Sequence, residues 1–508
     1  MANTQSFKKL QRQSVKRINV IIERFWWIAL IAAAVVTCVI IMLLARGQSI
    51  WFDEGYSIYI AHKPVGELLA LTAVDAHPPF YYLLLKAWAG VFGWSEFALR
   101  SLSAVAAAVS VGVMIALIRR LFNARIALIV MPFLVLSPFF LRYGYEVRMY
   151  ALVGLIGVVA TWVLVRALQS RRVWWWIGYA ALVALGMYTL YMSLVIWLAH
   201  VVWLLVRTLR DKQSIIKQKW FFAYVIAVGF FVPYLPTFLD QTSNSALPGI
   251  GGPLTIEKLS GVLGLLVSFT PSWQIGGVLS IGLLTMVGLG VYIGVSVWKK
   301  LNKTTKTRFG LFLSLAGVPL LFYIVVSLLP KPFFIDRYMA HVSLFIYVLL
   351  GLLVALGFAH GKRVSAVVLA MLSLVLLGFG VWQLQQSGNV NFERLQKPMT
   401  LQLRQSIDCA DAVVIADDPY TYIDSIYYFD GCDVRFVGQD PAPTRGGYAP
   451  LLGSSARITS LATFDRPTLY YLRWEGHEHQ FQPDSRYQFV STETFDKQIV
   501  DRFELSAE

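Results

Sequence analysis

The chain has 508 residues, of which 57% are hydrophobic, a higher share than soluble domains usually reach. Its formal net charge is +15, yet it has no basic stripe interleaved with aromatics, as on a nucleic-acid surface, outside the segments that flank apolar runs. The composition therefore excludes an ordinary soluble enzyme and a nucleic-acid-binding protein, and it indicates a polytopic α-helical membrane protein.

Apolar stretches long enough to cross a bilayer recur along the chain. The first, 26–45, is charge-free and lacks the cleavage site of a secretory signal, so we interpret it as a retained anchor. Ten further spans are predicted at 98–118, 125–141, 149–167, 174–190, 191–207, 219–239, 276–298, 308–329, 339–358 and 364–385. This makes about eleven spans, and the least certain division is the one at 187–191.

The distribution of charge predicts the orientation of these spans. With the N-terminus inside, the inner segments contain 24 Lys and Arg against two acids, whereas the short outer segments contain nine of each. This asymmetry follows the positive-inside rule. Ten spans would separate basic pairs such as Arg119-Arg120 and Lys299-Lys300 onto opposite sides. We therefore predict an inner N-terminus and an outer C-terminus.

The predicted organisation has a membrane domain, 1–385, and an outer domain, 386–508. The first outer loop, 46–97, contains two short apolar and aromatic stretches, 57–61 and 80–88, which we interpret as interfacial helices. The outer domain alternates predicted strands, at 411–418, 433–437 and 468–472, with a predicted helix at 420–428. This pattern indicates a small α/β domain. Its two cysteines, Cys409 and Cys432, are a plausible disulfide in an oxidising space.

The first outer loop begins with the acidic pair Asp53-Glu54, directly after the first span. Acids in this position are expected in the first turn of a helix, where they stabilise its N-terminus. They also suit catalysis, because a carboxylate can act as general base toward an acceptor hydroxyl. Both interpretations stay open from these residues alone.

Asp75 and His77 lie later in the same loop. His77 precedes two prolines and suits a helix cap, a substrate hydrogen bond or a metal ligand. Together with Glu54 and Asp75 it forms the candidate donor set for a possible divalent cation, Mg or Mn, although the spacing defines no site.

Charged residues also gather at two other outer connections. The connection 141–150 contains Arg142, Tyr145, Glu146 and Arg148; an aromatic belt explains its tyrosines, but an acid at membrane depth usually has a partner. We predict that Arg148 pairs with Asp53 or Glu54.

The second connection, 331–338, ends in Asp336-Arg337-Tyr338, where Arg337 provides a planar fork suited to phosphate. An interfacial anchor would explain the segment equally well. Arg100 and Lys86 are weaker phosphate candidates.

Four motifs in this order resemble the GT-C superfamily of membrane glycosyltransferases. They are Trp-Phe-Asp-Glu-Gly-Tyr at 51–56, His-Pro-Pro-Phe-Tyr-Tyr at 77–82, the segment 92–103 and Tyr-Glu-Val-Arg-Met-Tyr at 145–150. The likeness is greatest to the branch with protein O-mannosyltransferases and the aminoarabinose transferase of lipid A. It covers residues 50–190, and 335–338 extends it.

The resemblance implies an inverting transfer from a polyprenyl-phosphate sugar to a hydroxyl acceptor, at the extracytoplasmic face of a bacterial plasma membrane. By position, Asp53 corresponds to the catalytic acid–base residue and Glu54 to its companion. Arg148 corresponds to the arginine that meets this pair, and Arg337 lies in the donor-phosphate region. His77 departs from the aminoarabinose branch, which often has a lysine there. We count Lys86, Arg100, Tyr145, Glu146 and Tyr338 as further candidate substrate-binding residues.

The sequence does not identify the sugar, which could be a hexose or a pentose. It does not identify the acceptor either, which could be a protein, a glycolipid or a glycan. A lipid-linked saccharide transporter is the alternative from another class, but it would be expected to have polar or broken spans near the midplane. A polysaccharide polymerase and a membrane scaffold are further alternatives. Convergence of Asp53, Arg148 and Arg337 in the structure would discriminate among them.

Overall fold

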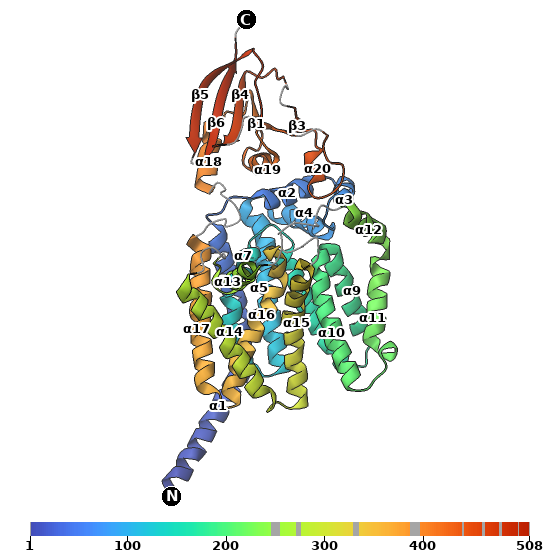
Figure 1. The fold of residues 1–508 in the computed structure, drawn as a ribbon, viewed down its shortest axis with the longest axis vertical. Coiled ribbons are helices and arrows are strands. Elements are labelled where there is room, and N and C mark those ends of the chain that lie inside the picture. The colour runs from blue at the N-terminus through green and yellow to red at the C-terminus, as the bar shows by residue number, and fades with distance from the viewer. Residues whose placement is uncertain are drawn as a thin grey trace.

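A computed structural model describes residues 2–244, 255–270, 276–328, 335–386, 397–438, 441–459, 463–476, 480–495 and 497–506. Within these ranges the protein is a long helical bundle with a small sheet domain at one end (Figure 1). The sheet domain lies on the first outer loop, and the N- and C-termini lie at opposite ends of the molecule. The predicted fold class, a helical membrane protein with a C-terminal α/β domain, is confirmed.

The bundle consists of long apolar helices joined by short connections, and three short helices form the first outer loop. The loop helices are α2 (Phe52–His62), α3 (Val65–Val74) and α4 (Phe80–Phe92). The bundle helices are α1 (Ala2–Ala45), α5 (Glu96–Leu121), α6 (Ala124–Val135), α7 (Pro138–Gly144), α8 (Tyr150–Gln169), α9 (Trp174–Thr189), α10 (Leu194–Arg210), α11 (Lys219–Phe231), α12 (Leu235–Asn244), α13 (Ile256–Ser268), α14 (Gly277–Trp298), α15 (Lys303–Ser327), α16 (Ala340–Ala359) and α17 (Arg363–Gln386). Short 3-10 turns, η1 (Tyr191–Ser193), η2 (Ile215–Lys217), η3 (Val232–Tyr234) and η5 (Asp336–Met339), adjoin several of them.

Among the described residues, nine helices are long and apolar enough to cross a membrane. The count rises to ten if α6 and α7, which meet at a bend of 63°, form one span. All eleven predicted spans fall on helices, but α9 has only 16 residues and is not among the helices that are long enough to cross. The number of spans and their sidedness therefore stay predictions.

The outer domain is a six-stranded mixed sheet with helices against it. Its strands are β1 (Ala412–Ala416), β2 (Asp433–Val437), β3 (Arg457–Ile458), β4 (Thr468–Trp474), β5 (Tyr487–Phe495) and β6 (Gln498–Leu505), in the order β3-β2-β1-β4-β6-β5. The strands β3, β2, β1 and β4 run parallel, whereas β6 is antiparallel to both of its neighbours. The helices are α18 (Lys397–Ser406), α19 (Pro419–Tyr428) and α20 (Ala449–Leu452). Cys409 and Cys432 form the predicted disulfide.

Helices α19 and α20 attach the sheet domain to the first outer loop. The hydroxyl of Tyr428 accepts a hydrogen bond from the Ile50 amide at 2.7 Å, and the hydroxyl of Tyr427 donates to the Trp94 carbonyl at 3.1 Å. Gly55 on α2 lies so close to α19 that a Cβ there would approach the Ile423 carbonyl oxygen to 2.9 Å. This tight seam brings outer-domain residues next to Asp53.

Candidate active site

The acidic pair lies in the first turn of α2, between the end of α1 and the sheet domain. Asp53 and Glu54 are each only 1% exposed. The turn forms here because Glu54 Oε2 accepts a hydrogen bond from the Trp51 amide at 3.3 Å, and because acids favour the positive end of a helix. The helix-start interpretation of these acids is therefore correct, but it leaves open why both carboxylates are buried.

Glu54 is fully engaged by Arg100. The Arg100 guanidinium donates to Glu54 from Nε at 3.0 Å and from Nη2 at 2.8 Å, a bidentate pair. Glu54 Oε1 also accepts from the Val147 amide at 3.0 Å. The Arg100 Nη groups also donate to the backbone carbonyls of Ala45, Gln48 and Ser49, and Nη1 lies 3.5 Å from Glu96 Oε2. This pair ties the end of α1, the start of α2 and the connection after α7 together.

Asp53 faces two arginines and one tyrosine. Arg337 Nη1 donates to Asp53 Oδ2 at 2.8 Å, and Arg148 Nε lies 4.0 Å from the same oxygen. The hydroxyl of Tyr448, from the outer domain, donates to Oδ1 at 2.5 Å. Asp53, Arg148 and Arg337 thus converge, and the predicted pairing of Arg148 with the acidic pair is confirmed for Asp53.

These contacts set the charge state of Asp53. Burial raises the pKa of the Asp53 carboxyl. Arg148, Arg337 and the Tyr448 hydroxyl together lower this pKa by more than burial raises it, so the pKa lies below its usual value. Asp53 is therefore ionised at neutral pH. Two guanidiniums face one carboxylate, so the group formed by Asp53, Arg148 and Arg337 has a net charge of about +1.

Both arginines also have unused donors. The Nε–H groups of Arg148 and Arg337 are buried and have no hydrogen-bond acceptor among the residues that the structure describes. Arg148 Nη1 donates to the hydroxyl of Ser57 at 3.2 Å, which fixes the side chain against α2. Arg337 is the more accessible of the two, with 25% of its side chain exposed, against 1% for Arg148. Buried, unpaired guanidinium donors are suited to an anionic ligand.

The connection after α7 contains a second buried pair. Arg142 Nη1 lies 2.8 Å from Glu146 Oε1, and the Arg142 guanidinium also lies 5.0 Å from the ring of Tyr145. Glu146 is fully buried, and burial raises its pKa to about 7 although Arg142 opposes this. The partner expected for Glu146 is thus Arg142 on the preceding helix. These residues hold the connection beside Asp53.

Asp75 and His77 lie next to the residues that contact Asp53. His77 Nδ1 lies 3.5 Å from Asp75 Oδ2, and His77 Nε2 lies 3.4 Å from Arg148 Nη2. Asp75 Oδ1 accepts from the Tyr448 amide at 3.0 Å. His77 therefore contacts the same arginine as Asp53, and Asp75 positions the tyrosine that covers Asp53.

The donors considered for a divalent cation do not form one set. Glu54 is bound to Arg100, while Asp75 and His77 contact each other, Tyr448 and Arg148. Within the described ranges no group of three or more His, Cys, Asp and Glu residues is arranged to hold a metal. We therefore derive no reaction step through a cation.

Three other candidates lie apart from Asp53 or contact it only indirectly. Lys86 Nζ donates to the Ala61 carbonyl at 3.2 Å and so caps the end of α2. Tyr338 is buried, and its carbonyl accepts from the Tyr323 hydroxyl at 2.9 Å. Tyr145 packs on Arg142 as described. Residues 331–334, which begin the predicted phosphate segment, lie outside the described residues.

Sequence reasoning missed Tyr448 and Ser57. Tyr448 has a left-handed backbone, φ 65°, which places its ring between Phe52 and Tyr56 with its hydroxyl on Asp53. Residue 448 is far from 53 in sequence, and no motif marks it. The adjacent glycines, Gly446 and Gly447, were the only local sign of an unusual turn.

With this geometry in place, the chain can be compared with known proteins. A family model described as dolichyl-phosphate-mannose-protein mannosyltransferase matches residues 76–236. That range includes His77, Arg100, Arg142 and Arg148, though not Asp53. No curated protein matches the chain. Together with the fold, this match confirms the resemblance to GT-C membrane glycosyltransferases.

Among solved structures, the chain is similar to ArnT from Cupriavidus metallidurans. The structure of that protein bound to undecaprenyl phosphate matches with a TM-score of 0.61 and 14% identity, over 94% of this chain and 98% of that one. The apo state matches with a TM-score of 0.57, also at 14% identity, over 94% and 97%. At this identity the comparison shows a shared fold along nearly the whole of both chains, including the sheet domain.

Proposed function

We propose that the protein is an inverting glycosyltransferase, which moves a sugar from a polyprenyl-phosphate donor to a hydroxyl acceptor, with Asp53 as general base. The observation on which this rests is the buried Asp53 carboxylate, which faces two arginines and already accepts a hydrogen bond from a hydroxyl group. The family match to mannosyltransferases and the undecaprenyl phosphate bound to ArnT support a lipid-phosphate donor. A transporter would have no need of such a base.

The reaction follows from the charges around Asp53. An acceptor hydroxyl takes the place of the Tyr448 hydroxyl on Oδ1 and gives its proton to Asp53 as its oxygen attacks the anomeric carbon. The bond from that carbon to the phosphate oxygen breaks, and the polyprenyl phosphate leaves from the opposite face. One displacement inverts the anomeric centre.

Arg337 connects the base to the leaving group. Negative charge develops on the phosphate in the transition state, and a guanidinium near it stabilises that charge. Because Arg337 is partly exposed and contacts Asp53 through Nη1, the exposed part of its guanidinium can bind phosphate while Nη1 stays on Asp53. Any weakening of its hold on Asp53 raises the pKa of this carboxyl and makes it a better base.

The other residues receive positioning roles in this proposal. Arg148 lies beside Asp53 and is itself contacted by His77, and Glu54 and Arg100 fix the start of α2. Glu54 is thus a structural companion of Asp53, and Lys86 and Tyr338 have no direct part. The reaction takes place at the outer face of a bacterial plasma membrane, as the charge distribution and the fold of ArnT together suggest.

Asp53→Asn tests this function. Purified protein is incubated with a panel of polyprenyl-phosphate hexoses and pentoses, and release of sugar or its transfer to hydroxyl acceptors is measured. We expect activity with at least one donor and a loss of about 100-fold or more in Asp53→Asn. Asp465→Asn, which removes a carboxylate that is 92% exposed, is the matched control and keeps full activity. Equal rates in Asp53→Asn and wild type would exclude Asp53 as the base.

A further inference from the structure

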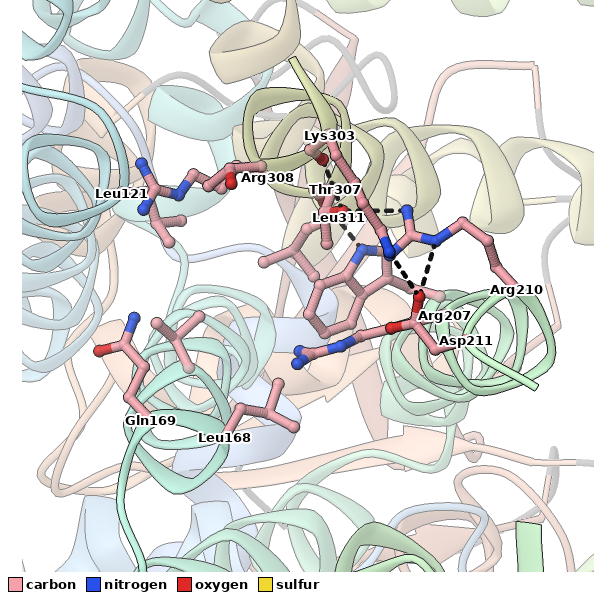
Figure 2. Close-up of a pocket in the computed structure, with 13 residues that line it drawn as sticks. Leu121, Leu168, Gln169, Arg207, Arg210, Asp211, Lys303, Thr307, Arg308 and Leu311 are labelled. Atoms are coloured by element: carbon pink, nitrogen blue, oxygen red, sulfur yellow. Dashed lines mark hydrogen bonds and ion pairs between the residues drawn. The ribbon is translucent and has the colours of Figure 1, made fainter. Parts of the chain in front are cut away.

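A second site lies at the end of the bundle opposite the sheet domain. A cavity of about 320 Å³ opens there between the ends of α5, α8 and α10 and the start of α15 (Figure 2). Its lining combines basic side chains with a wall of leucines; the residues that matter are Arg207, Arg210, Lys303, Arg308, Asp211 and Trp203. No step of the proposed reaction uses any of them.

This cavity is remote from Asp53. Helix α15 contacts the active-site region at its C-terminal end, where Tyr323 donates to the Tyr338 carbonyl, and it lines the cavity at its N-terminal end. Thr307 and Tyr323 are about 24 Å apart along the helix axis at 1.5 Å per residue. The predicted topology places the cavity at the inner face of the membrane, where the loops are rich in Lys and Arg.

The charges in the cavity do not cancel. Arg210 Nε and Lys303 Nζ lie 3.4 and 3.1 Å from the same Asp211 oxygen, so one acid serves two cations. Neither Arg207 nor Arg308 forms an ion pair with another residue in the part of the chain that the structure describes. The four cations and one acid leave an excess of about three positive charges around a space large enough for a ligand head group.

The walls are held in place before any ligand enters. The indole of Trp203 donates to the Thr307 carbonyl at 3.0 Å, and Arg210 Nη1 donates to the Thr307 hydroxyl at 3.0 Å, so α10 and α15 are fixed to each other (Figure 2). Arg207 lies over the Trp203 ring at 5.9 Å. Its guanidinium therefore stays beside the cavity, whereas a simple membrane anchor would extend freely into the head-group region.

We propose that this cavity binds the anionic phosphate head group of a membrane lipid from the inner leaflet. Guanidinium groups without an acidic partner, as in Arg207 and Arg308, match phosphate oxygens in charge and geometry. Leu121, Leu168 and Leu311 form the apolar part of the lining, which suits the carbon atoms next to a lipid phosphate better than it suits free phosphate ion. Basic pockets between membrane helices on this side are known to bind such head groups.

Native mass spectrometry of the full-length protein tests this proposal. Binding is titrated with phosphatidylglycerol, with phosphatidylcholine as the lipid of zero net charge, and with inorganic phosphate as competitor. The variants are Arg207→Gln, Arg308→Gln, the double variant and the charge-preserving Arg308→Lys. Arg171→Gln, at an exposed position on the same side and outside the cavity lining, is the matched control for lost charge. The melting temperature of each variant shows whether it is folded.

We expect tighter binding of phosphatidylglycerol than of phosphatidylcholine. Arg207→Gln and Arg308→Gln each weaken it about 5-fold, and the double variant about 25-fold. Arg171→Gln and Arg308→Lys stay within about 2-fold of wild type. An equal loss in Arg171→Gln would mean diffuse surface attraction and overturn the site. No preference for the anionic lipid would also overturn it, and competition by millimolar inorganic phosphate would assign the site to free phosphate instead of a lipid. Sugar transfer at Asp53 does not enter any of these readouts.

Discussion

Tyr448 closes the active site, and its removal should ease the entry of the acceptor. The Tyr448 hydroxyl occupies Asp53 Oδ1, the oxygen that an acceptor hydroxyl must reach. Asp53 is only 1% exposed, so the closed arrangement shown by the structure must open before transfer. We predict that Tyr448→Phe lowers the apparent KM for the acceptor and leaves kcat nearly unchanged, since Phe keeps the ring contacts and lacks the competing hydroxyl.

The size of this effect follows from the hydrogen bond that is lost. A hydrogen bond to a charged group contributes about 1.5–3 kcal/mol net. A free-energy change of about 1.4 kcal/mol alters an equilibrium constant tenfold. In Tyr448→Phe the ratio of closed to open state should therefore fall by about 10-fold to 100-fold. If the closed state predominates in the wild type, the apparent affinity for the acceptor rises by up to the same factor. Because this bond also lowers the pKa of Asp53, the variant should have a slightly stronger base.

Steady-state transfer measured over a range of acceptor concentrations checks this prediction. Tyr420→Phe is the matched control, because its ring packs on Phe52 at 4.3 Å in the same aromatic cluster, whereas the hydroxyl that donates to Asp53 Oδ1 is that of Tyr448. The control should leave KM unaltered. An apparent KM in Tyr448→Phe that is equal to the wild-type value, or higher, would refute the idea that Tyr448 competes with the acceptor and would make it a substrate-binding residue.

Three further predictions concern the buried pairs and the disulfide. Glu54→Gln leaves the Arg100 charge buried and should destabilise the protein by about 3–5 kcal/mol, seen as a lower melting temperature, whereas Glu54→Gln combined with Arg100→Met should recover part of it. The pKa of Glu146 is raised to about 7, so the folded state keeps a proton on this carboxyl that the unfolded state loses. The protonated carboxyl therefore contributes stability below about pH 4.5, and this contribution is lost as the pH rises to 7. Glu146→Gln should make the melting temperature less dependent on pH in this range. Reduction of Cys409–Cys432, which are 23 residues apart, should destabilise the outer domain by about 3 kcal/mol in thermal unfolding, and a Cys409→Ser variant should no longer respond to reductant.

Local patterns were enough to predict most elements of the fold. The predicted strands 433–437 and 468–472 correspond to β2 and β4, and the interfacial stretch 80–88 lies within α4, which begins directly after Pro79. These elements follow from apolar runs and from proline, whose effects act over a few residues. Helix α3 was not predicted, because Val65–Val74 is short and its apolar residues show little helical segregation.

The partners within the site were harder to predict, because they depend on tertiary contacts. Arg148 could be assigned to the acidic pair by charge and sidedness, but nothing in the sequence distinguished Asp53 from Glu54 as its partner. The structure separates them through Arg100, which engages Glu54 from 46 residues away. Arg100 had been considered for phosphate, since an arginine at the mouth of a span has no local mark of a structural role.

The contacts at the site also bear on the number of spans. Val147 bonds to Glu54 at the outer face, and Arg120 bonds to Gln169 at the other end of α5 and α8. The chain thus returns inward along α8. Directly after α9, however, the Met192 carbonyl contacts His341 Nε2, at the start of α16 beside Arg337. Between these two points only α9 can bring the chain outward. These contacts place the two ends of α9, which has only 16 residues, at opposite ends of the bundle, as the predicted eleven spans require; the termini also lie at opposite ends of the molecule (Figure 1), and the count of eleven stays a prediction.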